Sequence, residues 1–297
     1  MVSQATTQML TSRDIKVLHL EPTDVCQLAC PLCARETDKD FNKSRKNHLR
    51  VEQLEHILPE GFIEKLDKMF MCGNYGDPAA GTHTLAIYRY FRSKNPNIVL
   101  GMNSNGALQS TFWWHELGTV LNQSHDYVVF SIDGLEDTNP TYRINTNWQK
   151  LMSNVQAFIA AGGSAHWDML VYKHNQHQVD ACQQLAKDLG FKWFRAKVSK
   201  RPFIKNLEFP IGWQPSKVET AQVDCHALKE QSVYIDAQGR VSPCCWLGSR
   251  QKDFVTNFDE VQQSWSSLQP NITCIDTCAT ASGGTSFSNQ WQREIAL

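Results

Sequence analysis

The sequence IKVLHLEPTDVCQLACPLC at residues 15–33 decides the fold. Its first six residues, 15–20, are apolar except for Lys16 and His19 and have the length of a buried β-strand. Three cysteines then follow with the spacing Cys26-x3-Cys30-x2-Cys33. In parallel barrels the active site is built from the loops at the carboxyl ends of the strands. A strand that leads directly into closely spaced thiols therefore predicts a metal site at that edge of a sheet.

Thiolates at this spacing can hold three irons of a [4Fe-4S] cluster, which leaves the fourth iron without a protein ligand. A structural zinc site would normally recruit a fourth Cys or His nearby. A zinc site and unrelated thiols are the alternatives. The chain has ten cysteines, and its first fourteen residues lack the basic-then-apolar pattern of a signal peptide. We therefore expect metal ligation in a reducing cytoplasm rather than disulfides.

The composition is that of a globular protein and favours neither a nucleic-acid partner nor a membrane-spanning helix. Hydrophobic residues make up 41% and charged residues 20% of the 297 residues, which is typical of a globular protein. The net charge is −1, so nothing in the overall balance favours a nucleic-acid partner. No apolar run approaches the roughly 20 residues that a membrane helix needs.

Strand-like and helix-like segments alternate along most of the chain. We expect strands at 15–20, 68–72, 98–102, 127–132, 165–172 and 193–198, with helices near 50–66, 82–94, 111–122, 148–161 and 176–189. Such alternation predicts a parallel sheet with right-handed crossovers. The predicted fold class is α/β, an open (β/α)6 partial barrel of the TIM type. It would occupy residues 1–210, and a small cysteine-rich domain with a β-hairpin would occupy residues 211–297.

The cysteine spacing resembles the signature of the radical S-adenosylmethionine (radical SAM) superfamily, in which the open iron binds the amino and carboxylate groups of SAM. Further motifs resemble that family in the expected order. Residues 73–78, Gly-Asn-Tyr-Gly-Asp-Pro, look like a variant of its Gly-Gly-Glu-Pro motif, and the sequence Ser-Ile-Asp-Gly at 131–134 precedes Tyr142-Arg143. The resemblance implies SAM contacts at Tyr75, Gly76, Asp77, Asn103, Ser104, Asn105, Ser131, Asp133 and Arg143.

A second group of cysteines lies in the last quarter of the chain. The pattern Cys225-x13-Gly239-x4-Cys244 is similar to the opening of SPASM and twitch extensions, where a hairpin carries two ligands of an auxiliary [4Fe-4S] cluster. The resemblance implies that Cys274 and Cys278 complete the set. Five cysteines are too few for two clusters, so a twitch domain with one cluster is the better interpretation. A zinc site is the alternative.

Three further residues, Cys245, Arg195 and Glu21, are candidates for catalysis. Cys245 is a surplus thiol that could be a bystander, a replacement ligand for Cys244 or a hydrogen-atom donor. Arg195 and Lys197 share one face of the sixth expected strand, and burying two cations in the barrel demands an anionic partner. That partner could be the SAM carboxylate or an anionic substrate; alternatively, both cations are solvated at an open barrel edge. Glu21 follows the first strand, close to the expected cluster.

The segment Arg35–Arg50 carries six basic residues. It could form a lid over an anionic substrate, but a solvated loop is the commoner meaning of such a run.

The resemblance implies an enzyme that reductively cleaves SAM to a 5′-deoxyadenosyl radical and abstracts hydrogen from a substrate carbon. The chemistry would be of the oxidoreductase or isomerase type, with a reductant such as flavodoxin or ferredoxin. The auxiliary cluster would assist substrate binding or oxidation. Only about 15 residues precede the first strand, which shifts the expectation towards a small substrate (a sugar, cyclitol or nucleotide) or a leader-independent peptide. Alternatives are a peptide epimerase or cross-linking enzyme with a thiol hydrogen donor and, more remotely, an electron carrier or a zinc-stabilised module.

Overall fold

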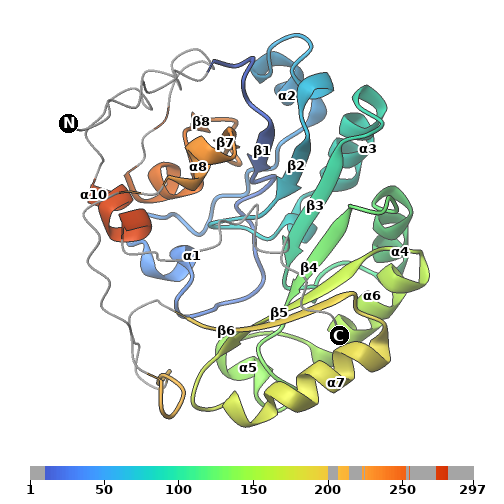
Figure 1. Cartoon of the computed structure of the whole chain (residues 1–297), viewed down its shortest axis with the longest axis vertical. Coiled ribbons are helices and arrows are strands. Elements are labelled where there is room, and N and C mark those ends of the chain that lie inside the picture. The colour runs from blue at the N-terminus through green and yellow to red at the C-terminus, as the bar shows by residue number, and fades with distance from the viewer. Residues whose placement is uncertain are drawn as a thin grey trace, which may run out of the picture.

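The computed structural model describes residues 11–199, 207–213, 223, 225–251, 254 and 272–279. Six parallel strands form the larger part of one sheet, and all six lie where the sequence predicts them. Their order along the sheet follows the chain, and they curve around a common interior (Figure 1). The strands are β1 (Val17–Leu20), β2 (Lys68–Met71), β3 (Val99–Ser104), β4 (Tyr127–Ser131), β5 (Ala165–Val171) and β6 (Trp193–Val198).

Helices connect successive strands and cover the outer side of the curved sheet (Figure 1). They are α2 (Val51–Ile57), α3 (Thr84–Lys94), α4 (Thr111–Val120), α6 (Trp148–Ala160) and α7 (Val179–Leu189). Shorter elements lie within the connections: α1 (Ala34–Thr37), α5 (Asn139–Tyr142) and the 3₁₀ turns η1 (Ile63–Lys65), η2 (Pro78–Ala80) and η3 (Gln176–Gln178). The alternation of strands and helices confirms the partial-barrel prediction.

Local sequence explains where the helices begin and end. The side chain of Ser110 accepts a hydrogen bond from the Trp113 N–H (3.3 Å), and Asn147 caps α6 in the same way through Lys150 (2.9 Å). α7 ends at Gly190, whose φ of +85° belongs to the left-handed region. The helix expected over 50–66 ends at Ile57, because Pro59 forces Leu58 into an extended conformation.

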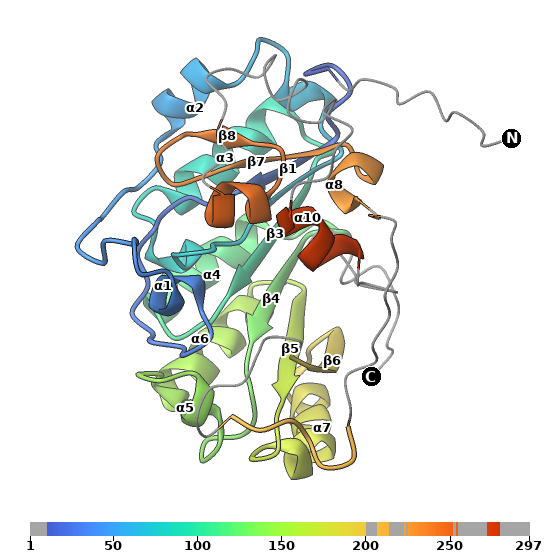
Figure 2. The ribbon, with the colours of Figure 1, turned by 90° about the vertical axis from the view of Figure 1, so that its left-hand side faces the viewer.

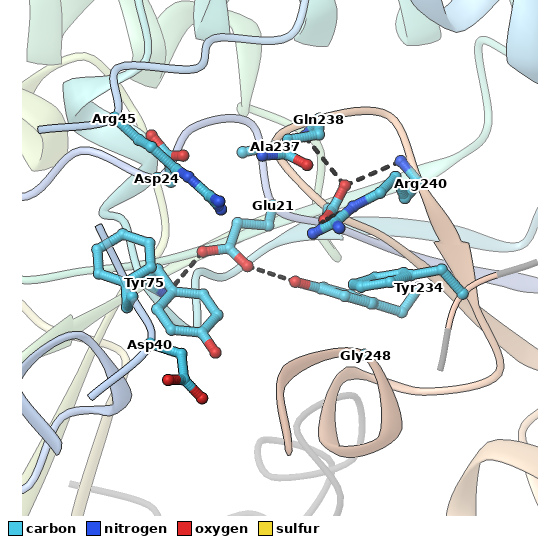
Figure 3. A pocket seen from close by; sticks show the side chains of 13 residues that line it. Glu21, Asp24, Asp40, Arg45, Tyr75, Tyr234, Ala237, Gln238, Arg240 and Gly248 are labelled. Atoms are coloured by element: carbon cyan, nitrogen blue, oxygen red, sulfur yellow. Dashed lines mark hydrogen bonds and ion pairs between the residues drawn. The ribbon is translucent and has the colours of Figure 1, made fainter. Parts of the chain in front are cut away.

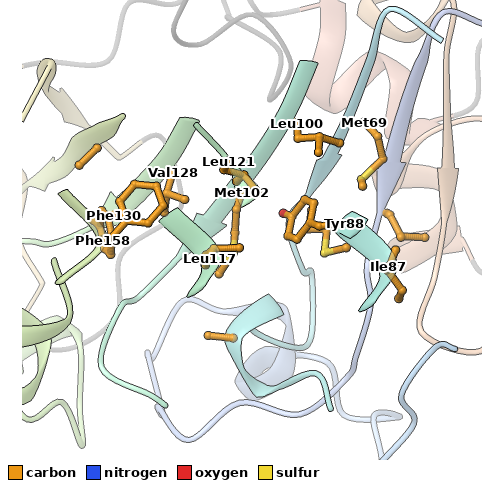
Figure 4. Close-up of a cluster of buried hydrophobic side chains, with 14 of the residues drawn as sticks. Met69, Ile87, Tyr88, Leu100, Met102, Leu117, Leu121, Val128, Phe130 and Phe158 are labelled. Carbon is orange, nitrogen blue, oxygen red and sulfur yellow. The ribbon is translucent and has the colours of Figure 1, made fainter. Parts of the chain in front are cut away.

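The core lies between the sheet and these helices, and Figure 4 shows its centre. Phe130 on β4 is fully buried and contacts Trp114 of α4 and Phe158 of α6, with ring centroids 5.1 and 5.9 Å apart. Tyr88 of α3 is also fully buried, and its hydroxyl donates to the Gly101 carbonyl on β3 (2.7 Å). Apolar packing therefore fixes each helix against the strands beside it.

The C-terminal hairpin continues the same sheet. β7 (Ser232–Ile235) pairs parallel with β1, and β8 (Val241–Ser242) pairs antiparallel with β7. Gly239 forms the turn between them with a φ of +81°. The hairpin prediction is confirmed, and its pairing with β1 extends the sheet to eight strands. The domain division at residue 210 stays a prediction, and part of the expected boundary at 202–215 lies outside the described residues.

Two further segments follow the hairpin. They are the π-helical turn η4 (Leu247–Gln251) and the pair α10 (Ile272–Cys274) and η5 (Ile275–Ala279), while α8 (His226–Lys229) precedes β7. α10 lies beside η4, as Figures 1 and 2 both show. No described helix combines the length and the apolar character that crossing a bilayer would require.

The Phe130→Ala variant tests the core. We expect it to lower the free energy of unfolding by about 3–5 kcal/mol, because truncation of a fully buried ring removes its contacts and leaves a cavity. Chemical denaturation followed by circular dichroism measures this change. Phe112→Ala is the matched control, since Phe112 is 73% exposed and its truncation should change stability by less than about 0.5 kcal/mol. Equal effects of the two variants would contradict the assignment of Phe130 to the core.

Candidate active site

The three N-terminal cysteines lie in the loop between β1 and α1, at the carboxyl end of the sheet. Cys30 is buried, while Cys26 and Cys33 are partly buried. Nitrogen donors from three parts of the chain surround the sulfurs. The Leu28 N–H points at the Cys26 sulfur (3.4 Å), and so does the Asn105 side-chain amide (3.8 Å). The Arg143 guanidinium lies 3.9 Å from the Cys30 sulfur.

Burial favours the protonated form of these thiols, whereas the donors around them favour the thiolate. Burial raises the pKa of Cys26 to about 12, and the carboxylate of Asp77 adds to the shift. Burial also raises the pKa of Cys30, which the charge of Arg143 opposes. Metal binding would replace these protons, and the N–H donors and the guanidinium would offset the negative charge on sulfur.

No group of three or more His, Cys, Asp or Glu side chains among the described residues is arranged to hold a metal ion. Such a site for one ion requires ligands that converge on a single point. A four-iron cluster differs, because each cysteine binds a different iron.

Glu21 follows β1 and is 1% exposed. Its Oε1 accepts hydrogen bonds from the backbone N–H groups of Tyr75 (2.7 Å) and Gly76 (3.0 Å), and its Oε2 accepts one from the Tyr234 hydroxyl (Figure 3). Burial raises the pKa of Glu21 to about 7, although these hydrogen bonds oppose the shift. Glu21 thus joins β1, the loop after β2 and the hairpin strand β7.

The loop after β2 leaves no room for side chains at its glycines. A Cβ atom on Gly76 would lie 1.9 Å from the Thr23 carbonyl oxygen, and one on Gly73 would lie 2.0 Å from the Gly76 oxygen. The two glycines therefore allow the loop to pack closely against the backbone of its own chain. The Tyr75 hydroxyl lies within hydrogen-bond distance of two acceptors, the Asp38 carboxylate (2.7 Å) and the Ser249 carbonyl (3.0 Å).

Asp77 links the ends of β2 and β3. Its carboxylate accepts from the Ser104 hydroxyl (2.7 Å), the Asn105 N–H (2.7 Å), the Asn105 amide (2.6 Å) and the Ala79 N–H (2.9 Å). The Asp77 oxygens are thus occupied by donors of the chain. Asn103 differs, because its buried Oδ1 has no hydrogen-bond partner in the part of the chain that the structure describes.

Asp133 holds Arg143 in place after β4. Its carboxylate accepts from the Arg143 Nε (2.6 Å) and from the Leu170 N–H of β5 (2.6 Å). The guanidinium is thereby fixed between Asp133 and the Cys30 sulfur. Ser131 is half-buried at the end of β4, level with Asp168 on β5. The structure therefore brings these polar groups to the same edge of the sheet as the cysteines.

Arg195 and Lys197 lie on β6, on the opposite face from the buried Phe194. Asp168 of β5 accepts two hydrogen bonds from Arg195 (both 2.9 Å) and one from Lys197 (2.8 Å). Burial alone would raise the pKa of Asp168, but the charge of Lys197 and the bonds from Arg195 lower it. Asp168 on the neighbouring strand is therefore an anionic partner of the kind that the sequence led us to expect for Arg195 and Lys197.

The C-terminal cysteines separate into two directions. Burial raises the pKa of Cys244 to about 12, and the charges of Cys225 and Cys274 add to the shift. Cys278 lies one helical turn beyond Cys274. Cys245 is buried, and its thiol lies near Cys72 and Glu21. The charges that act on the two adjacent thiols thus differ: Cys225 and Cys274 act on Cys244, whereas Cys72 and Glu21 act on Cys245.

A cavity of about 270 Å³ lies between the loop after β2 and the hairpin (Figure 3). Glu21, Tyr75, Tyr234 and Arg240 contribute to its wall. The basic segment 35–50 borders it with Arg45, which is exposed. The sequence favoured a solvated loop for this segment, but Arg35 is not solvated. Its side chain is buried and donates to the Asp24 carbonyl (2.6 Å).

No protein-family model matches this chain, and no curated protein matches it. Among solved structures, it is similar to Streptococcus suis SuiB bound to S-adenosylmethionine, with 15% identity over 84% of this chain and a TM-score of 0.60. SuiB bound to its precursor peptide SuiA gives 13% identity over 89% of this chain and a TM-score of 0.62. The fold is that of the radical SAM enzymes.

A third similar structure is anSMEcpe with bound AdoMet, at 16% identity over 84% of this chain and with a TM-score of 0.60. The chain spans 65% of the SAM-bound SuiB chain, 71% of the peptide-bound one and 76% of anSMEcpe. The expected resemblance to radical SAM enzymes is thus confirmed at the level of the fold.

The Asp77→Asn variant tests the junction of β2 and β3. We expect a loss of about 2–3 kcal/mol in the free energy of unfolding, because the new amide group would face donors and leave them unsatisfied. Urea denaturation of the metal-free protein measures this loss. Asp188→Asn is the control: its exposed carboxylate accepts only from Gln184 among the described side chains, and the substitution should be neutral within about 0.5 kcal/mol. A neutral Asp77→Asn variant would contradict the proposed junction.

Proposed function

We propose that this chain is a radical SAM enzyme whose cluster is held by Cys26, Cys30 and Cys33. The observation that carries the proposal is the meeting of these three thiols with Asn105 and Arg143 at the carboxyl edge of the barrel. The similarity of the fold to SuiB and anSMEcpe supports it. When bound, the cluster supplies the electron that cleaves SAM reductively to the 5′-deoxyadenosyl radical, which abstracts hydrogen from a substrate carbon.

The residues of the chain then bind and orient SAM. Arg143 is fixed by Asp133 beside Cys30, where it can pair with the SAM carboxylate, with Ser131 nearby. Asn103 offers its unpartnered buried oxygen to a hydroxyl of the ribose. Asp77 acts indirectly, because it holds Ser104 and Asn105 at the end of β3.

The loop after β2 supplies acceptors for the SAM ammonium. The thiol of Cys33 donates to the Asn74 carbonyl (3.6 Å). A cysteine that binds metal has lost this proton, so the Asn74 carbonyl becomes free to accept from another donor. We assign that donor to the ammonium group.

The auxiliary cluster is assigned to Cys225, Cys244, Cys274 and Cys278. The charges of Cys225 and Cys274 both act on the Cys244 thiol, which supports three of these ligands. Cys245, whose thiol lies towards Cys72 and Glu21, is better placed for a role on the barrel side, such as that of a hydrogen-atom donor. A reductant such as flavodoxin or ferredoxin would supply electrons.

A peptide is the substrate class that we favour, because SuiB was solved with its precursor peptide SuiA and anSMEcpe with the Cp18Cys peptide. Lys197, whose side chain is 39% exposed beside Asp168, suits an anionic group on that substrate. A sugar, cyclitol or nucleotide is the second candidate, and a phosphate or carboxylate on it would satisfy the same charge. The net reaction, oxidation or epimerisation, depends on whether the auxiliary cluster or Cys245 acts last.

The Cys26/Cys30/Cys33→Ala variant tests the function. After anaerobic reconstitution we expect roughly eight irons per wild-type chain and roughly four in the variant, since one of two four-iron clusters is lost. With dithionite and SAM, wild type should release 5′-deoxyadenosine and the variant none.

Two comparisons complete this test. Cys182→Ala removes a fully buried thiol of the core and should leave iron content and SAM cleavage unchanged. The iron content of the Cys225/Cys244/Cys274→Ala variant should also fall to roughly four irons per chain, while the variant retains SAM cleavage. Wild-type protein that binds iron but never yields 5′-deoxyadenosine would overturn the proposal.

A further inference from the structure

We propose that Glu21 and Tyr234 form a positioning pair through which the C-terminal hairpin aims the Asn74 carbonyl of the loop after β2 at the SAM ammonium. The inference rests on the proposed function and deepens it, because it gives the C-terminal segment a part in SAM binding that does not require an auxiliary cluster. Glu21, which the sequence suggested as a catalytic residue, becomes a positioning residue.

The first step is the geometry of the peptide bonds at 74–76. The Tyr75 N–H and the Gly76 N–H both donate to Glu21 Oε1, at 2.7 and 3.0 Å. Neither bond is cis, and in a planar trans peptide the C=O points away from the N–H. The carbonyls of Asn74 and Tyr75 must therefore point away from Glu21.

The structure places those two carbonyls on the cluster side. The Asn74 carbonyl is the acceptor for Cys33 Sγ (3.6 Å), and the Tyr75 carbonyl faces the Arg35 guanidinium (3.4 Å). Both donors belong to the cysteine loop and the helix that follows it. Glu21 thus binds the N–H edge of the 74–75 and 75–76 peptide planes, and this sets the direction of the carbonyl oxygen on the opposite edge.

The second step is what holds Glu21. Tyr234 is 2% exposed and donates its hydroxyl to Glu21 Oε2. The same hydroxyl accepts from the Asn74 side-chain amide (3.3 Å), which also donates to the Cys245 carbonyl (3.2 Å). The loop is therefore bonded to β7 and to the segment after β8, as Figure 3 shows for Glu21 and Tyr234.

The third step is that the loop cannot adjust by moving towards β1. Gly76 already lies against the Thr23 carbonyl, and even a Cβ atom would not fit there. Tyr75 is tied to Ser249 by its hydroxyl (3.0 Å). The loop is packed against Thr23 at Gly76 and is hydrogen-bonded at Tyr75. The orientation of the 74–75 and 75–76 peptide planes therefore depends on the Glu21 carboxylate.

The test measures SAM affinity and backbone protection in variants of the pair. Tyr234→Phe removes one hydroxyl and should weaken the equilibrium binding of SAM to the iron-reconstituted protein by about five- to ten-fold. Glu21→Ala should weaken it more, while Glu21→Gln keeps an oxygen for the two N–H groups and should restore most of the affinity. Hydrogen–deuterium exchange without SAM should be faster at the Tyr75 and Gly76 amides in Tyr234→Phe and Glu21→Ala.

Tyr88→Phe is the matched control. It also removes a fully buried hydroxyl donor, but its acceptor is the Gly101 carbonyl within the barrel. It should leave SAM affinity and the exchange of the two loop amides unchanged. If Glu21→Ala does not fold, the comparison of Tyr234→Phe with Tyr88→Phe still decides.

The outcomes separate this inference from the proposed function. Wild-type protein that fails to bind SAM overturns the function. If wild type binds SAM and Tyr234→Phe binds it equally well with unchanged exchange, the positioning pair is wrong although the function stands. Weaker binding accompanied by loss of iron would also overturn the pair, because the effect would then arise at the cluster.

Discussion

Buried carboxylates at the ends of neighbouring strands hold the site edge of this sheet together. Glu21 after β1 bonds the loop after β2, Asp77 in that loop bonds the end of β3, Asp133 after β4 bonds β5, and Asp168 on β5 bonds β6. A buried carboxylate is costly unless donors satisfy it, and here each finds its donors on the next strand or loop. The acids therefore fix the loops relative to one another, and the cysteines and Arg143 take their positions from that arrangement.

Much of the fold could be predicted because its signals are local. Strand-length apolar runs separated by amphipathic segments gave all six barrel strands, and Gly239 between two short strands gave the hairpin. The pairing of β7 with β1 could not be foreseen, because Val17 and Ser232 are more than 200 residues apart and neither carries a mark of its partner. Alternation identified a polar face on β6, but the neutralising Asp168 required knowledge of the register between β5 and β6.

The candidate site divides in the same way. Spacing alone singled out the three cysteines, since short loops restrict where thiols can go. The partners of Glu21 were hidden, because they are backbone N–H groups, which every residue carries, and one hydroxyl on a distant strand. The burial of Arg35 could not be predicted, because Arg35 belongs to a basic run. In the structure its guanidinium donates to the Asp24 and Tyr75 carbonyls. Composition describes such a segment as solvated, and only the fold distinguishes the one buried cation.

The continuity of the sheet gives the C-terminal segment its significance. Because β7 is hydrogen-bonded to β1, the hairpin is held against the strand that leads into the cysteine loop. Cys244 and Cys245 follow that hairpin directly, with one thiol near Cys225 and Cys274 and the other near Cys72 and Glu21. A rigid sheet transmits position better than a flexible linker would. Backbone pairing and the contacts of Tyr234 therefore fix the positions of the two cysteine groups relative to each other. A change in the hairpin would alter the conformation of the loop after β2 first, because Tyr234 contacts that loop.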